Sequence, residues 1–159
     1  MNLSSSSNHY PLLKGFQDLQ PKELYQLASR DCIEKGIGYF LSEKITRFFY
    51  DPKAGCLKAT VAGDSDYSVT LARKNKNWKV HCDCPGFLTH GHCKHVVAAA
   101  AMTYYLFYHH NFTFYQPSID YIEKIQDQLE HSLKSCGLLK QAPSSSPKQE
   151  SSVKIKKSV

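Results

Sequence analysis

The sequence lacks both an apolar run long enough to cross a bilayer and an amino-terminal secretion signal. Its longest apolar stretch, residues 96–108, is interrupted at Thr103 and is shorter than the ~20 residues that a membrane-spanning helix needs. The first seven residues contain four serines and no basic residue, so they have neither the charged nor the apolar region of a signal peptide. We therefore expect an intracellular protein in a reducing compartment.

Two sequence motifs of catalytic sites are also missing. No glycine-rich loop ends in Lys-Ser or Lys-Thr, the ending by which P-loops bind nucleotide phosphates and magnesium. The His-x-Glu motif of the zinc deaminases is absent as well. We expect a protein that is not an enzyme and has no small-molecule substrate.

The six cysteines are the most informative residues that are present. In a reducing compartment they indicate a metal site with spare thiols in preference to three disulfides. Cys32, Cys56 and Cys136 are the spare thiols, for which packing is the expected role. The remaining three lie close together in sequence with a histidine, and the predicted metal ligands are Cys82, Cys84, Cys93 and His95.

The spacing of these four residues fits a strand followed by a helix. On a strand, Cys82 and Cys84 point to the same face, and a bend at Pro85 and Gly86 would aim both sulfurs at one ion. On a helix, residues two apart diverge, so Cys93 must precede the helix while the histidine occupies its first turn. A Cys₃His set is one that tetrahedral zinc accepts, and we predict a structural Zn²⁺ at the helix amino terminus.

Two alternatives remain open at this point. Cys82 and Cys84 could form a dithiol redox pair in place of a metal site. His81, His90 or His92 could replace His95 as the fourth ligand, because all three lie nearby in sequence.

The Cys-x-Cys pair, a short loop, and Cys-Lys-His followed by small apolar residues resemble the SWIM-type zinc finger. The similarity covers roughly residues 24–106 and extends to the bacterial members that precede Swi/Snf-type helicase cores. Its upstream positions are Ala28, Gly36, Tyr39, Phe40, Ala59, Val61, Gly63, Val69 and Trp78. The resemblance implies a module that contacts DNA or a protein in helicases, transposases and recombination factors, with any ATP-driven motor on another polypeptide.

The rest of the pattern predicts an α+β fold: a small antiparallel β-meander carrying the zinc knuckle, with flanking helices. The predicted strands are residues 45–50, 56–62, 67–73 and 78–82, separated by turn-forming sequences. A first helix, capped by Asp18, is predicted from Pro21 to Gly36. A second starts near Lys94, is apolar nearly all round and should be buried.

A last amphipathic helix is predicted after Ser118 and ends at Gly137. Its apolar stripe from Ile119 to Leu133 either covers the domain or docks a partner helix. The tyrosines of the buried helix, Tyr104, Tyr105 and Tyr108, are expected in the core, although an exposed aromatic patch is the alternative. The domain is therefore predicted to span residues 21–137, between a disordered lead-in (1–20) and a disordered Ser/Pro/Lys-rich tail (138–159).

The net charge of +6 is concentrated in the tail, where five lysines face one glutamate from residue 140 onward. Within the body, one local cluster beside the finger favours a phosphate contact. It consists of Arg73, Lys74, Lys76, Lys79 and Lys94. We predict a module that binds DNA, or a DNA-handling protein such as a helicase or recombination protein. The alternative is a scaffold that binds proteins only, with these lysines forming a solvated hairpin.

Overall fold

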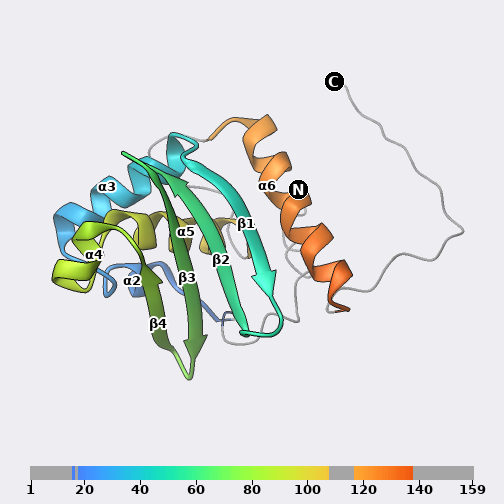
Figure 1. Cartoon of the computed structure of the whole chain (residues 1–159), viewed down its shortest axis with the longest axis horizontal. Coiled ribbons are helices and arrows are strands. Elements are labelled where there is room, and N and C mark those ends of the chain that lie inside the picture. Colours follow the sequence, from blue (N-terminus) through green and yellow to red (C-terminus); the bar gives the residue numbers. More distant parts are fainter. Residues whose placement is uncertain (1–15, 17, 108–116, 138–159) are drawn as a thin grey trace, which may run out of the picture.

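A four-stranded antiparallel sheet forms the centre of the fold (Figure 1). The computed structural model describes residues 16, 18–107 and 117–137. Each strand pairs with the next along the chain, in the order β1 (Ile45–Asp51), β2 (Cys56–Ala62), β3 (Asp66–Lys74) and β4 (Asn77–Cys82). The predicted meander and α+β class are confirmed, and the strand bounds agree with the predicted ones to within one residue.

Alternation along the strands directs one face of the sheet into the core. Leu57, Ala59 and Val61 of β2 and Val69 and Leu71 of β3 are buried, as their period of two predicts. The β3–β4 hairpin closes through Asn75 and Lys76, which both have positive φ. That backbone is typical of a tight two-residue turn whose twist matches the strands.

The helices are α2 (Pro21–Leu24), α3 (Arg30–Leu41), α4 (Pro85–His90), α5 (Lys94–Phe107) and α6 (Ile119–Ser135). In Figure 1, α5 passes behind the strands. It packs on β2, β3 and β4, and α3 packs on α5. Helix α6 lies beside β1 at the edge of the sheet (Figure 1).

Helix α5 is the buried helix of the domain. Residues 96–102 are fully inaccessible to solvent, and Tyr104 and Tyr105 are buried with them. These two tyrosines are therefore core residues, and the alternative of an exposed aromatic patch is wrong for them; Tyr108 lies outside the described residues. Within the described ranges, no helix combines the length and the apolar character needed to cross a membrane.

The prediction of one helix from Pro21 to Gly36 is wrong. The chain forms the short α2, breaks, and starts α3 after Ser29, whose side chain accepts a hydrogen bond from the Cys32 backbone N–H at 3.4 Å. Gly36 lies inside α3, at the point where this helix approaches α5 closely. A Cβ atom on Gly36 would lie 2.4 Å from the Val97 Cβ atom.

The predicted lead-in of residues 1–20 also overlaps the folded domain. Phe16 and Leu19 are buried in the core, and the Phe16 ring meets the edge of Trp78 at a centroid distance of 5.9 Å. Asp18 does not cap α2, whose N-cap is Gln20. The predicted tail, residues 138–159, lies outside the described part of the chain.

Helix α6 covers the open edge of the sheet, as the first of its two predicted roles requires. Its N-cap is Ser118, and Ile125, Leu129 and Leu133 are buried, although Ile119 is exposed. The Gln128 side chain accepts a hydrogen bond from the Phe48 backbone N–H, and Ser132 accepts one from Tyr50 N–H. Edge strands pair readily with other chains. These two side chains occupy backbone N–H groups of β1 and so block the pairing of a further strand there.

We expect Gly36→Ala to lower the free energy of unfolding by about 1–3 kcal/mol, because its methyl group overpacks the contact between α3 and α5. Gly38→Ala is the matched control on the same helix, since a Cβ atom there meets nothing within 4 Å. The control should be neutral or stabilising by up to ~1 kcal/mol. Equal urea midpoints for the two variants would contradict the close approach of the helices.

Candidate metal centre

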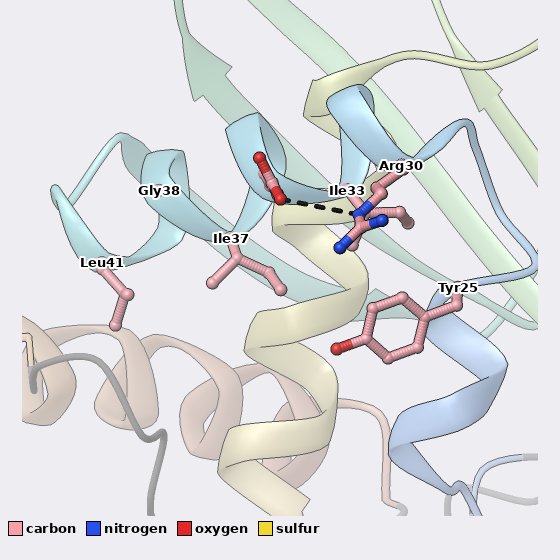
Figure 2. A pocket seen from close by; sticks show the side chains of 7 residues that line it. Tyr25, Arg30, Ile33, Ile37, Gly38 and Leu41 are labelled. Atoms are coloured by element: carbon pink, nitrogen blue, oxygen red, sulfur yellow. Dashed lines mark ion pairs between the residues drawn. The ribbon is translucent and has the colours of Figure 1, made fainter.

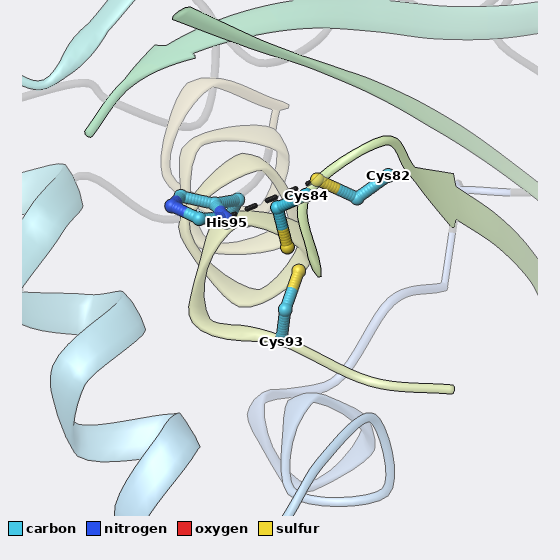
Figure 3. Close-up of side chains that lie close together, drawn as sticks. All are labelled: Cys82, Cys84, Cys93 and His95. Carbon is cyan, nitrogen blue, oxygen red and sulfur yellow. Dashed lines mark hydrogen bonds between the residues drawn. The ribbon is translucent and has the colours of Figure 1, made fainter. Parts of the chain in front are cut away.

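Four buried side chains converge at the end of β4 and the start of α5 (Figure 3). One donor atom from each of Cys82, Cys84, Cys93 and His95 lies within 4.8 Å of all the others. The structure thus brings together the four residues that the sequence spacing selects.

The first two cysteines are placed by the end of β4 and by a short helix. Cys82 is the last residue of the strand, and Cys84 is the N-cap of α4. Its sulfur accepts a hydrogen bond from the Phe87 backbone N–H at 3.3 Å. The bend predicted at Pro85 and Gly86 is the first turn of α4. Pro85 is the first residue of this helix, a position at which proline is favoured.

The second pair has the arrangement that the spacing predicts. Helix α5 begins at Lys94, so Cys93 precedes it and His95 lies in its first turn. The Cys93 sulfur accepts a hydrogen bond from the Val96 backbone N–H at 3.5 Å. Free N–H groups and the positive end of the helix dipole favour a thiolate at this point.

The His95 ring is fixed by two tyrosines. Tyr67 of β3 lies 4.7 Å from it between ring centroids, and Tyr39 of α3 meets it edge-on at 5.6 Å. A Cβ atom on Gly63 would lie 3.1 Å from His95 Nε2, so the glycine leaves room for the ring. The Nδ1 atom faces the sulfurs, 3.9 Å from Cys82 Sγ, while Nε2 is buried without a hydrogen-bond partner among the described residues.

These donors suit a tetrahedral zinc ion. Zinc bonds of about 2.3 Å to sulfur and 2.0 Å to nitrogen place neighbouring donors about 3.5–3.8 Å apart. The donors of the cluster lie within 4.8 Å of one another, and Cys82 Sγ is 3.9 Å from His95 Nδ1. A hydrogen bond from Cys82 lowers the pKa of Cys93 to about 4. The same contact, with burial, raises the pKa of Cys82 well above its usual value. Zinc binds cysteine as the thiolate, so its binding would release the protons that these thiols carry.

The other nearby histidines lie outside the cluster. His92 Nδ1 is 3.7 Å from the Cys32 sulfur, and the His90 ring stacks on His92 at 5.9 Å. His81 is exposed and meets the edge of Phe87. Among the described residues, His95 is the one imidazole that joins the three sulfurs.

Arg73 differs from the other basic residues that the sequence grouped with it. Its side chain is 1% exposed, and its Nε and Nη2 atoms donate to the two carboxylate oxygens of Glu23 at 2.9 Å. A further bond of 3.0 Å joins Nη1 to Asp18. Arg73 therefore anchors α2 to β3 and is not available to a phosphate. This pairing could not be predicted from the sequence, because both acidic partners lie some fifty residues away in the chain.

The four lysines of the predicted cluster do not form a single patch. Lys74, Lys76 and Lys79 are exposed on the β3–β4 hairpin. Lys76 pairs with the exposed Asp18 at 3.4 Å. Lys94 is half-buried at the start of α5, with its Nζ atom 5.0 Å from the centre of the Tyr39 ring.

A groove apart from the metal cluster shares no residue with it. It measures roughly 460 Å³ and lies along α3 (Figure 2). Its floor contains Ile33, Ile37 and Leu41, and Tyr25 stands at its edge. The polar groups are Arg30 and Glu34, an exposed ion pair with 3.9 Å between its atoms, so this groove brings no further metal-ligand set to the site.

Zinc loss should unfold the finger, because the binding free energy of such a site is of the order of the stability of a whole domain. Cys84→Ser and Cys93→Ser should each lower the zinc content from one ion per chain and the unfolding temperature. The matched control is Cys136→Ser, a half-buried cysteine at the end of α6, which should retain the ion. Metal analysis and thermal unfolding with and without a chelator measure both quantities. Full zinc content in the Cys93 variant would contradict the ligand set.

Arg73→Gln should lower the free energy of unfolding by about 3–5 kcal/mol, because it leaves the buried Glu23 carboxylate without its partner. The adjacent Lys74→Gln should change it by less than ~0.5 kcal/mol, since that side chain is exposed. Denaturant titration compares the two. If both variants are equally stable, the buried ion pair does not anchor α2.

Comparison with known proteins agrees with this geometry over the part of the chain that forms the site. No curated protein and no solved structure matches the chain. Residues 67–104 match the family model described as the SWIM zinc finger. The match covers about a quarter of the chain, runs from β3 into α5 and contains all four members of the cluster. It supports the SWIM zinc-finger family for this segment.

Proposed function

We propose that this protein is a non-catalytic SWIM-type module that binds DNA through the β3–β4 hairpin beside its zinc finger. The observation that supports this most strongly is that the Cys₃His cluster of the SWIM match lies at the base of a hairpin with three exposed lysines. Structural zinc sites have four protein ligands, whereas catalytic sites keep one position for water or substrate. Under this proposal the ion holds β4 to α5 and takes no part in a reaction.

The hairpin offers cationic side chains for phosphate groups. Its tight turn holds Lys74 and Lys76 at the tip, and Lys79 follows on β4. The pair between Lys76 and Asp18 has both side chains more than half exposed, so exchanging it for a phosphate costs little. Arg73, the residue before Lys74, attaches the tip end of the same hairpin to the core through its buried pair with Glu23.

The proposed partner includes a DNA-handling protein, such as an intracellular Swi/Snf-type helicase to which this module would be an accessory. That association rests on the sequence resemblance alone. The alternative of a pure protein scaffold used two surfaces, the aromatic helix and the α6 stripe. Both are now poor candidates, since Tyr104, Tyr105 and Leu129 are buried inside the domain.

Replacing Lys74, Lys76 and Lys79 together by glutamate should abolish most DNA binding. In wild type, affinity should fall steeply with salt, because each neutralised phosphate contributes about 0.9 to the slope of log K against log salt. The matched control reverses three exposed lysines outside the hairpin, Lys22, Lys124 and Lys134. Fluorescence anisotropy with labelled DNA measures affinity and slope. Unchanged binding by the hairpin variant, or equal loss in the control, would refute the proposed mechanism.

A further inference from the structure

The outer face of the sheet, opposite α5, carries a set of side chains that the core does not need. Figure 1 looks onto the sheet with α5 behind it. Directly paired residues of neighbouring strands share a face, and one such row crosses all four strands. It is formed by Phe49, Lys58, Thr70 and His81.

A bulge in β1 places the aromatic end of this row on the outer face. Ile45 pairs with Val61 and Phe48 pairs with Ala59, and all four are buried. Between these pairs β1 has two residues where β2 has only Thr60. The extra residue reverses the alternation, so Arg47 and Phe49 point outward. Bulges commonly re-aim a side chain next to a functional site.

Arg47 and Phe49 form a stacked pair at the β1 side of the face. The Arg47 guanidinium carbon lies 5.3 Å from the centre of the Phe49 ring. Both residues line a groove of roughly 330 Å³ between β1 and α6, to which His131 of α6 also contributes. An aromatic ring and a guanidinium plane are the two groups on which unpaired bases stack in nucleic-acid complexes.

The charge on this face is suited to a phosphate backbone. Arg47 lies at one side, and Lys74 and Lys79 of the hairpin lie at the other. Lys58, between them, is paired with Asp51 at 3.0 Å. The other carboxylates at the margins are Asp66 and Asp83, and Asp83 accepts a hydrogen bond from the Ser68 backbone N–H.

We propose that this outer face binds single-stranded nucleic acid, with one base stacked on the Arg47–Phe49 pair and the backbone running across the sheet toward Lys79. A duplex fits poorly, because four strands about 4.8 Å apart are too wide for a major groove of about 12 Å, which admits a helix or a two-stranded ribbon. With strands about 4.8 Å apart the row spans about 14 Å, and four-stranded sheets that bind single strands stack two or three bases. This inference rests on the proposed function only in taking nucleic acid as the ligand.

The test measures anisotropy of labelled oligo(dT), oligo(rU) and a duplex of the same length with the full chain and its zinc. Single strands should bind more tightly than the duplex, and a preference between the first two probes identifies DNA or RNA. Phe49→Leu should weaken single-strand binding roughly five- to a hundredfold through lost stacking, with no change in salt slope. Arg47→Gln should weaken it and also lower the slope by about 0.7.

Thr70→Glu is a second test that does not depend on the folding of the Phe49 variant, because it adds a negative charge at the centre of the face between Lys58 and His81. It should reduce single-strand binding at least fivefold while thermal unfolding stays near wild type. The matched controls are Arg30→Gln on α3, where the side chain is 93% exposed, and Gln26→Glu, also exposed; both should bind as wild type does.

The outcomes separate this inference from the proposed function. Tighter duplex binding that depends on the hairpin lysines but not on Arg47, Phe49 or Thr70 overturns the inference and leaves the proposed function standing, with the hairpin acting as a two-stranded ribbon. Absence of binding to all three probes overturns both.

Discussion

The structure depends on one local junction, where three sulfurs and one imidazole hold the end of β4 to the start of α5. Cys82 and Cys84 come from the strand side and Cys93 and His95 from the helix side. This junction sets the position of α5, on which the other layers rest, because α5 lies between the sheet and α3. The hairpin lysines are in turn fixed relative to the finger, since Lys79 and Cys82 both lie on β4, which pairs with β3 up to Lys74.

The second constraint is the close packing of α5 within the domain. Its run of alanines and Gly36 of α3 bring the helices together, while the Arg73–Glu23 pair attaches the short α2 to the far end of β3. The apolar and ionic groups on the inner side of the sheet are thus buried in contacts that stabilise the fold. Of the two faces of the sheet, the outer one and its hairpin carry exposed cations, which is why both proposals concern that side of the molecule.

Much of the fold and the cluster could be predicted because the signals were local. Turn residues and the period of two located the strands. The two-residue spacing of the ligands predicted that Cys93 precedes the helix and that His95 lies in its first turn. Contacts between distant segments could not be predicted. Gly36 appeared to end a helix because its contact with Val97 is invisible in sequence, and Arg73 resembled its lysine neighbours because Glu23 and Asp18 reach it only in the fold. The bulge that turns Phe49 outward likewise depends on the pairing of β1 with β2.

The most direct test of the metal junction is zinc K-edge X-ray absorption on the purified protein. The account predicts one zinc per chain, with three sulfur neighbours at about 2.3 Å and one imidazole nitrogen at about 2.0 Å. A folded protein without metal, or a zinc shell of nitrogen and oxygen alone, would contradict it.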